Sequence, residues 1–117
     1  MIKKSNEMKL VERPNIRNGN GVIRCQNLLE KEEMYGGFKY VSIMKFGPGD
    51  SIGDHQHADD VEIYYFLEGR FSADDNGTPV VLEKGDVMIT GNGESHSIKN
   101  IYDGESVLSV VIILRNQ

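Results

Sequence analysis

Three histidines form the part of the sequence with the clearest chemical meaning. His55 and His57 are separated by one residue, and His96 is the only other histidine in the chain. Residues i and i+2 of a strand point to the same face of a sheet, so both imidazoles of the pair can reach one ion. Imidazole is the commonest protein ligand for borderline divalent metals. The pair therefore predicts a metal site, whereas a single histidine such as His96 is more often structural than a ligand.

Glu62 is the acidic residue that we expect to share this site. It lies in the apolar run 61–67, where its face of the strand also carries Tyr64 and Phe66. A carboxylate on an aromatic, inward-facing surface is costly unless it is paired or bound to a metal. The offset from His57 is odd, but residues 58–60 indicate a break between strands, after which Glu62 can face the same interior as the histidine pair.

Short segments rich in β-branched and aromatic residues must position these side chains. Each segment closes at glycine, asparagine or aspartate, and together they predict strands at 22–29, 38–46, 61–67, 71–73, 79–83, 87–90, 96–101 and 107–115. Short strands with turn signals roughly every ten residues indicate an all-β sandwich or barrel. We expect a single domain over residues 1–117. Only Asn27 to Tyr35 has the composition of a helix, and that helix would be barely two turns long.

Two of the predicted strands are apolar on both faces. In the run 61–67 the face opposite Glu62 carries only apolar and aromatic residues. In the run 107–114 the only polar residue is Ser109. A strand that is apolar on both faces needs a second cover. We therefore expect a homodimer, with residues 1–20 forming an N-terminal arm that packs on the dimer partner.

Two stretches of the chain resemble the two sequence motifs of the cupin family. The first motif places His-x-His and then a glutamate between two glycines, and the second places a histidine and an asparagine after a glycine-rich turn. The first is matched by Gly49, His55, His57, Glu62 and Gly69, and the second by Gly85, Gly93, His96 and Asn100. Gly91 stands where the second motif usually has proline, which affects only the local turn.

The resemblance implies a double-stranded β-helix, or jelly-roll barrel, with a metal inside it. By family likeness the ligands are His55, His57, Glu62 and His96, while the motif glycines and Asn100 are structural. Three imidazoles and one carboxylate leave one or two coordination positions for water or substrate, as a catalytic metal requires. Such ligands suit Mn, Fe, Co, Ni or Zn and do not select among them. The alternative is a cupin that keeps these four residues without loading a metal.

The family likeness predicts a metal-dependent enzyme of the oxidoreductase or dioxygenase type that acts on a small organic molecule. One alternative is a metal-dependent sugar isomerase or an oxalate-type decarboxylase. Another is a non-catalytic module that binds or senses a small molecule or a metal. Tyr64 is the candidate catalytic residue, because its hydroxyl could donate a hydrogen bond or a proton to a metal-bound ligand.

The expected cavity wall is mostly apolar, which suits a small, weakly polar ligand that chelates the metal through oxygen. Its expected lining residues are Met44, Tyr64, Phe66, Met88 and Ile98. Each of them is equally explained by core packing. Arg70 is the one arginine near the motifs that could clamp a carboxylate or phosphate, and this scarcity argues against oxalate and sugar-phosphate chemistry.

Charge and composition narrow the partners. The net charge is −5, and an acidic chain repels phosphate backbones, so we expect no nucleic-acid partner. Cys25 is the only cysteine, which excludes an internal disulfide framework and suits a reducing cytoplasm. The first twelve residues lack the apolar run of a signal peptide and the longest apolar stretch is too short to span a bilayer, so we expect a cytoplasmic protein that does not enter a membrane.

Overall fold

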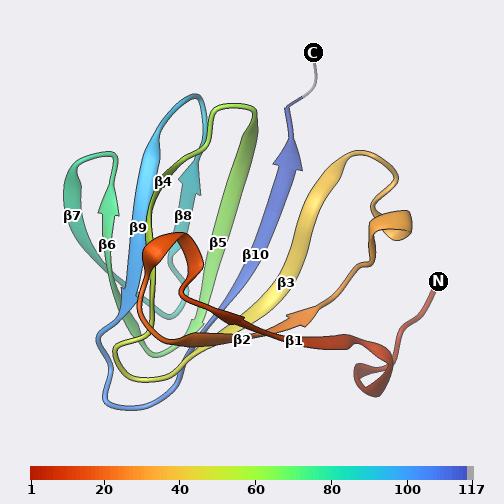
Figure 1. The fold of residues 1–117 in the computed structure, drawn as a ribbon, viewed down its shortest axis with the longest axis horizontal. Coiled ribbons are helices and arrows are strands. Elements are labelled where there is room, and N and C mark those ends of the chain that lie inside the picture. The colour runs from red at the N-terminus through yellow and green to blue at the C-terminus, as the bar shows by residue number, and fades with distance from the viewer. Residues whose placement is uncertain (116–117) are drawn as a thin grey trace.

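The computed structural model describes residues 1–115 and consists of two antiparallel sheets that pack face to face as a jelly-roll barrel (Figure 1). The six-stranded sheet has the order β1-β2-β3-β10-β5-β8, and the four-stranded sheet has the order β4-β9-β6-β7. The strands are β1 (Lys9–Pro14), β2 (Val22–Asn27), β3 (Phe38–Phe46), β4 (Ser51–Gln56), β5 (Asp60–Glu68), β6 (Arg70–Asp75), β7 (Thr78–Glu83), β8 (Val87–Thr90), β9 (Ser95–Asn100) and β10 (Ser106–Leu114). Three short 3₁₀ turns complete the fold: η1 (Ser5–Glu7), η2 (Ile16–Asn18) and η3 (Lys31–Met34).

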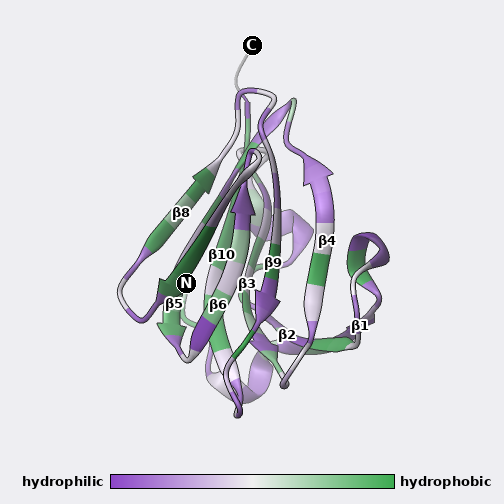
Figure 2. Ribbon diagram, turned by 90° about the vertical axis from the view of Figure 1, so that its left-hand side faces the viewer, coloured by the Kyte–Doolittle hydropathy of each residue, from purple (hydrophilic) through white to green (hydrophobic). Residues whose placement is uncertain are grey.

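The core lies between the two sheets and follows the alternation of each strand. Along β5, Glu62, Tyr64 and Phe66 are buried, as predicted, whereas Tyr65 on the other face is 44% exposed. The six-stranded sheet contributes Phe66 and Leu108 to the same cluster as Phe71 and Ile98 of the four-stranded sheet. Figure 2 shows green stretches on strands such as β5 and β8, whereas the end of β4 on the other side of the barrel is purple.

The chain between β2 and β3 corrects the one expected helix. Asn27 to Tyr35 was the predicted helical segment, but β2 extends to Asn27 and only Lys31–Met34 forms a single 3₁₀ turn. Tyr35 then adopts a left-handed conformation, with φ of 51°, and ends the turn. Good helix formers do not suffice here, because so short a helix cannot repay the cost of nucleation. No helix among residues 1–115 has both the length and the apolar character needed to cross a bilayer.

The N-terminal arm, residues 1–20, contains a strand that sequence patterning did not identify. β1 pairs antiparallel with β2 of the same chain and extends the six-stranded sheet at its edge. The chain then turns through η2 and lies against β4, where the Ser51 amide donates to the Asn20 carbonyl over 2.9 Å. Figure 1 shows this turn beside β4. The packing of the arm on a dimer partner stays a prediction.

Asn100 joins two loops at the base of the barrel, the β3–β4 loop and the β9–β10 loop. Its buried side-chain amide donates to the carbonyls of Phe46, Gly47 and Gly104, over 3.0, 3.0 and 2.9 Å. Its side-chain carbonyl accepts from the Ser106 hydroxyl at 2.7 Å and from the Tyr102 amide at 2.9 Å. The amide is therefore fully used within the fold, which confirms the structural role expected for this residue.

Replacement of Asn100 by alanine should lower the free energy of unfolding by about 3 kcal/mol, because buried carbonyls and the Ser106 hydroxyl lose their partner. Urea denaturation measures the change. The matched control is Lys99→Ala, at the exposed neighbouring position, which should change stability by less than about 0.5 kcal/mol. A loss below about 1 kcal/mol for Asn100→Ala would contradict this account of the loop junction.

Candidate metal centre

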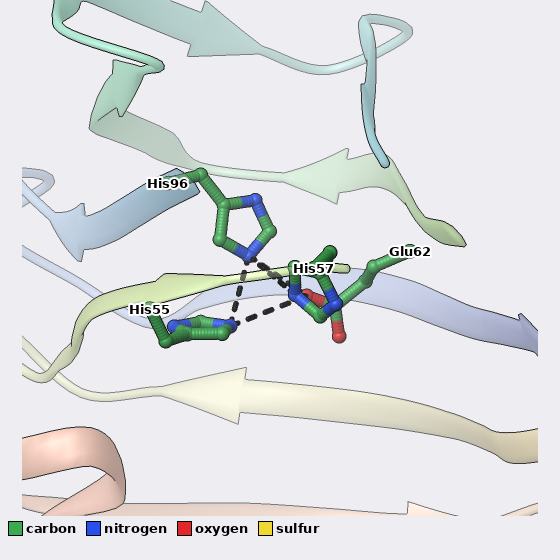
Figure 3. A group of neighbouring side chains, drawn as sticks. All are labelled: His55, His57, Glu62 and His96. Atoms are coloured by element: carbon green, nitrogen blue, oxygen red, sulfur yellow. Dashed lines mark hydrogen bonds and ion pairs between the residues drawn. The ribbon is translucent and has the colours of Figure 1, made fainter. Parts of the chain in front are cut away.

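Both sheets contribute to the cluster of His55, His57, Glu62 and His96. β4 carries His55 and leads directly to His57, β9 carries His96, and β5 of the opposite sheet carries Glu62. Figure 3 shows the three imidazole rings turned toward one another, with the Glu62 carboxylate among them. One ligand atom from each of the four residues lies within 4.8 Å of all the others. The structure thus brings together all four residues that the sequence predicted.

A β-bulge in β4 directs His55 into the barrel. Ile52 pairs with Ile98, but the next pair is His55 with His96, so β4 contains one more residue than β9 over this stretch. In a regular strand, His55 would point to the face opposite the buried Ile52, because side chains alternate along a strand and the two residues are three positions apart. Beyond the strand, the His57 backbone is fixed by two 2.9 Å hydrogen bonds, from its amide to the Glu94 carbonyl and from the Gly93 amide to its carbonyl.

The four side chains meet at distances suited to a common ion. The Nε2 atom of His96 lies 3.0 Å from that of His55 and 3.2 Å from that of His57. Glu62 Oε1 lies 2.8 Å from His96 Nε2, 3.0 Å from His57 Nε2 and 3.7 Å from His55 Nε2. Glu62, His57 and His96 are buried, and His55 is partly buried.

The outer ring nitrogens are held by groups that set the tautomers. His55 Nδ1 lies 2.8 Å from the Gly53 carbonyl and His57 Nδ1 lies 2.6 Å from Asp60 Oδ1. A carbonyl and an ionised carboxylate only accept hydrogen bonds, so in the neutral rings both hydrogens sit on Nδ1. His96 Nδ1 lies 2.7 Å from the Thr90 hydroxyl. The Nε2 lone pairs of His55 and His57 therefore point into the cluster.

This arrangement fits a cation. Bare Nε2 atoms cannot donate to Glu62, and its buried Oε1 has no hydrogen-bond partner among the described residues. Lone pairs and a carboxylate oxygen that converge in a buried space repel one another unless a positive charge lies between them. The donor set, three imidazole nitrogens and one carboxylate oxygen, suits a divalent transition metal.

Without a metal, the same charges are partly balanced by protons. Burial opposes ionisation of Glu62, but the imidazoles of His55, His57 and His96 outweigh it and hold the pKa of the carboxyl far below its ordinary 4.5. The nearby Glu62 carboxylate raises the pKa of His57 above 6.5, against the opposing effect of burial and with further help from Asp60. A proton on His57 thus substitutes in part for a bound cation.

Tyr64 lies beside the cluster and stacks on His96, with ring centroids 5.2 Å apart and an angle of 9° between the ring planes. Burial, and then the charge of Glu62, raises the pKa of its hydroxyl well above 10. The hydroxyl is therefore neutral near neutral pH and can act as a hydrogen-bond donor. Of the expected wall residues, Tyr64 and Met44 line the adjoining cavity, whereas Phe66, Met88 and Ile98 pack in the core.

The cavity next to the cluster has a volume of about 410 Å³, and both cations and acids line it. Its apolar wall includes Ile16, Ile52 and Ile112, and its cations are Arg13, Arg17 and Lys39. These cations correct the expectation that only Arg70 could reach an anion. Arg70 is exposed, does not line this cavity, and lies 3.5 Å from Glu83 across the β6-β7 pair.

Two groups of residues around the cluster and its cavity were not predicted from the sequence. Arg13 and Arg17 were missed because residues 9–14 were not identified as a strand, and their sequence shows no regular alternation of apolar and polar residues. Asp60 and Thr90, which hold the outer nitrogens of His57 and His96, were also missed. Asp60 lies three residues after His57, whereas Thr90 reaches His96 from the other sheet.

Comparison with known proteins agrees with this geometry. The family model described as a cupin domain matches residues 42–113. The chain is 40% identical over 114 residues to a protein of Thermotoga maritima called oxalate-binding protein, covering 97% of this chain and 94% of the relative. A crystal structure described as a predicted oxalate decarboxylase from Thermotoga maritima superposes with a TM-score of 0.91 at 39% identity, covering 97% of this chain and 99% of the other.

A more distant neighbour supports the fold alone. An RmlC-like cupin from Shewanella frigidimarina superposes with a TM-score of 0.75 at 15% identity, covering 98% of this chain and 91% of the other. The family model covers more than half of the chain and includes all four residues of the cluster. The two-sheet barrel, the convergent histidines and these matches together establish that the chain belongs to the cupin family.

Proposed function

We propose that His55, His57, Glu62 and His96 bind a divalent transition metal and that this metal holds a small carboxylate of the oxalate type. The observation that carries the proposal is the convergence of imidazole lone pairs and a buried carboxylate next to a cavity that Arg13 and Arg17 also line. A relative that is 40% identical is called oxalate-binding, which supports a carboxylate ligand. A bound metal would act as a Lewis acid toward such a ligand.

The residues of the chain prepare this site before a ligand arrives. Gly53, Asp60 and Thr90 hold the three rings so that their Nε2 atoms face inward. Lys39 lies 3.1 Å from the second oxygen of Asp60 and keeps that carboxylate ionised and oriented. Tyr64 offers a neutral hydroxyl beside the cluster, and the barrel wall limits the access of water. Such prior orientation lowers the cost of ligand binding.

The reaction class follows from what happens to oxalate on the metal-loaded protein. Release of formate and carbon dioxide would identify an oxalate decarboxylase, and consumption of dioxygen with formation of peroxide would identify an oxidase. Tight binding without turnover would identify a binding module. Failure of oxalate to bind to the metal-loaded protein in calorimetry would contradict the proposed function.

A second candidate function is an oxidative enzyme of the dioxygenase type acting on a small organic molecule. The apolar wall formed by Ile16, Met44, Ile52 and Ile112 favours a ligand with an apolar body. Dioxygen uptake by iron- or manganese-loaded protein over a panel of catechols, diketones and flavonoids tests this function. Uptake with one of these and no turnover of oxalate would favour the second candidate over the first.

Glu62→Gln should lower metal affinity by about 100-fold, because an amide oxygen replaces the only carboxylate among the ligands. Competition against a chromophoric chelator measures the affinity. The matched control is Glu68→Gln, on the same strand but exposed at its end, which should bind metal as the unmodified chain does. Equal affinities for Glu62→Gln and the unmodified chain would remove Glu62 from the ligand set.

Metal binding should stabilise the fold more as the pH rises. The raised pKa of His57 stabilises the metal-free protein below pH 6.5, and this contribution is lost as the pH rises through the folded-state pKa. A metal needs the neutral ring, so its own contribution grows over the same interval. Thermal unfolding with and without Zn²⁺, at intervals from below to above pH 6.5, measures the difference. A stabilisation by metal that does not change with pH would contradict this link.

Tyr64→Phe should weaken oxalate binding to the metal-loaded protein by roughly tenfold, the loss expected for one hydrogen bond to a charged group. Metal affinity should stay unchanged, because Tyr64 is not a ligand. The matched control is Tyr65→Phe, on the outer face of the same strand, which should change neither affinity. Full oxalate affinity in Tyr64→Phe would end its assignment as a hydrogen-bond donor to the ligand.

The outer face of the six-stranded sheet supports the homodimer predicted from the sequence. Val87 and Ile89 of β8 are 50% and 61% exposed, and they lie in register with Tyr65 and Ile63 of β5. A face of this kind favours association. Sedimentation should give a dimer at micromolar concentration, and Ile89→Lys should shift it toward monomer. A pure monomer for the unmodified chain would remove the prediction. The cytoplasmic location and the lack of a nucleic-acid partner stay predictions as well.

A further inference from the structure

Arg13 occupies an unusual place for a charged residue in a barrel. It pairs in register with Ile23, which is fully buried, so both side chains lie on the inner face of the six-stranded sheet. The guanidinium carbon lies 5.4 Å from the ring centroid of Tyr40. Both residues line the cavity beside the metal cluster. Arg13 thus presents its charge to the inside of the barrel rather than to the surface.

Of the three cations that line this cavity, Arg13 is the one that is partly buried and not paired with an acid of the described chain. Among residues 1–115, Arg13 forms no ion pair, whereas Lys39 is paired with Asp60 at 3.1 Å. Arg17 also lines the cavity but is exposed. The acids of the lining are Glu62 in the metal cluster, Asp60 on His57, and Asp59, which is exposed on the rim. A partly buried guanidinium that has no acidic partner within the described chain favours the binding of an anion from outside it.

The position of Arg13 is built into the fold rather than left to a loose terminus. β1 is held by β2, and the following turn includes left-handed conformations at Asn15, Arg17 and Asn18, with φ of 47°, 53° and 64°. The turn packs so closely on β4 that a Cβ at Gly53 would overlap the Arg17 carbonyl. Non-glycine residues in this conformation are costly and persist only where the surroundings enforce them.

The strand register separates Tyr40, the residue that Arg13 contacts, from the metal cluster. Tyr40 aligns with Ile112, and Ile112 aligns with Glu62, so the three residues form one row across β3, β10 and β5. Neighbouring strands are about 4.8 Å apart, which puts roughly 10 Å between the backbones of Tyr40 and Glu62. The wall between them is apolar, with Ile112 in the row itself and Met44 nearby.

Oxalate is too short to use both ends of this cavity. Its two carboxylates share a single carbon–carbon bond, so oxalate that chelates a metal through both of them has no further anionic group for Arg13. A cavity of about 410 Å³ also falls within the range that holds considerably larger ligands. The cavity is therefore matched to a longer molecule with an anionic group at each end and an apolar segment between them.

We infer that Arg13 is a specificity-determining residue that receives the distal anionic group of a ligand whose other end chelates the metal. This inference rests on the proposed function, in which a carboxylate is held at His55, His57, Glu62 and His96. The ligand class is a dicarboxylate with a chelating 2-oxo or 2-hydroxy acid at one end and a short aliphatic chain leading to a second carboxylate. Oxalate binds through the metal alone.

Calorimetry on Zn²⁺-loaded protein tests the inference with three probes: oxalate, 2-oxoadipate and 2-oxohexanoate. The two longer probes share the same chelating end and chain length, and only 2-oxoadipate has the distal carboxylate. The unmodified chain should bind 2-oxoadipate about tenfold or more tightly than 2-oxohexanoate, as expected for a charge-assisted hydrogen bond. This comparison needs no variant, so it holds even if a variant folds poorly.

Variants then locate the effect. Arg13→Gln should bring the affinity for 2-oxoadipate down to that for 2-oxohexanoate and leave oxalate within about twofold, while Arg13→Lys should recover part of the difference. The matched control is Arg24→Gln on the neighbouring strand, where the guanidinium is exposed and pairs with Glu105. It should behave as the unmodified chain does for all three probes.

The outcomes separate this inference from the proposed function. If oxalate binds but the two longer probes bind equally, or if Arg13→Gln weakens all three probes to the same extent, the role of Arg13 is overturned and the carboxylate site stands. If no probe binds to protein shown to hold Zn²⁺, the proposed function fails and the inference falls with it. If 2-oxoadipate binds more tightly than 2-oxohexanoate, and this preference is lost in Arg13→Gln but not in Arg24→Gln, both the proposed function and the inference are supported.

Discussion

The burial of Glu62 among three imidazole nitrogens is the constraint on which the rest of the structure depends. An ionised carboxylate in a barrel interior carries a large desolvation cost, and three ring nitrogens lie within 2.8 to 3.7 Å of one of its oxygens. These rings are fixed from behind by Gly53, Asp60 and Thr90. The Nε2 lone pairs of His55 and His57 therefore face the carboxylate, and these nitrogens donate no hydrogen bond to it. The interior is thereby matched to a cation, and no apolar packing of the same strands would create that need.

The same constraint explains features that lie far from the cluster. The ligands come from both sheets, so the site exists only when the barrel is closed, and the Asn100 junction at its base supports that closure. The bulge between Ile52 and His55 interrupts the regular pairing of β4 and turns the side chain of His55 inward. Gly53, within this bulge, leaves room for the turn after β1, which carries Arg17 to the rim and follows Arg13. The candidate metal site and the arginines that line the cavity are therefore linked through one strand.

The sequence predicted the parts of this arrangement that depend on local alternation and motif spacing. The inward face of β5, with Glu62, Tyr64 and Phe66, followed from strand periodicity, and the convergence of all four candidate ligands followed from the motif positions. The rest depends on how distant segments meet. Arg13 lines the cavity because β1 pairs with β2 at the sheet edge, and Thr90 of β8 reaches the ring of His96 from the opposite sheet. The expected helix at Asn27 to Tyr35 failed because composition alone does not stabilise so short a segment.

The metal content of the purified protein tests the central claim most directly. Protein prepared without a histidine tag should contain about one transition-metal ion per chain by elemental analysis, or take up about one after chelation and reconstitution. The Glu62→Gln variant, treated in the same way, should retain much less. Unmodified protein that contains no transition metal and takes up none on reconstitution would contradict the account.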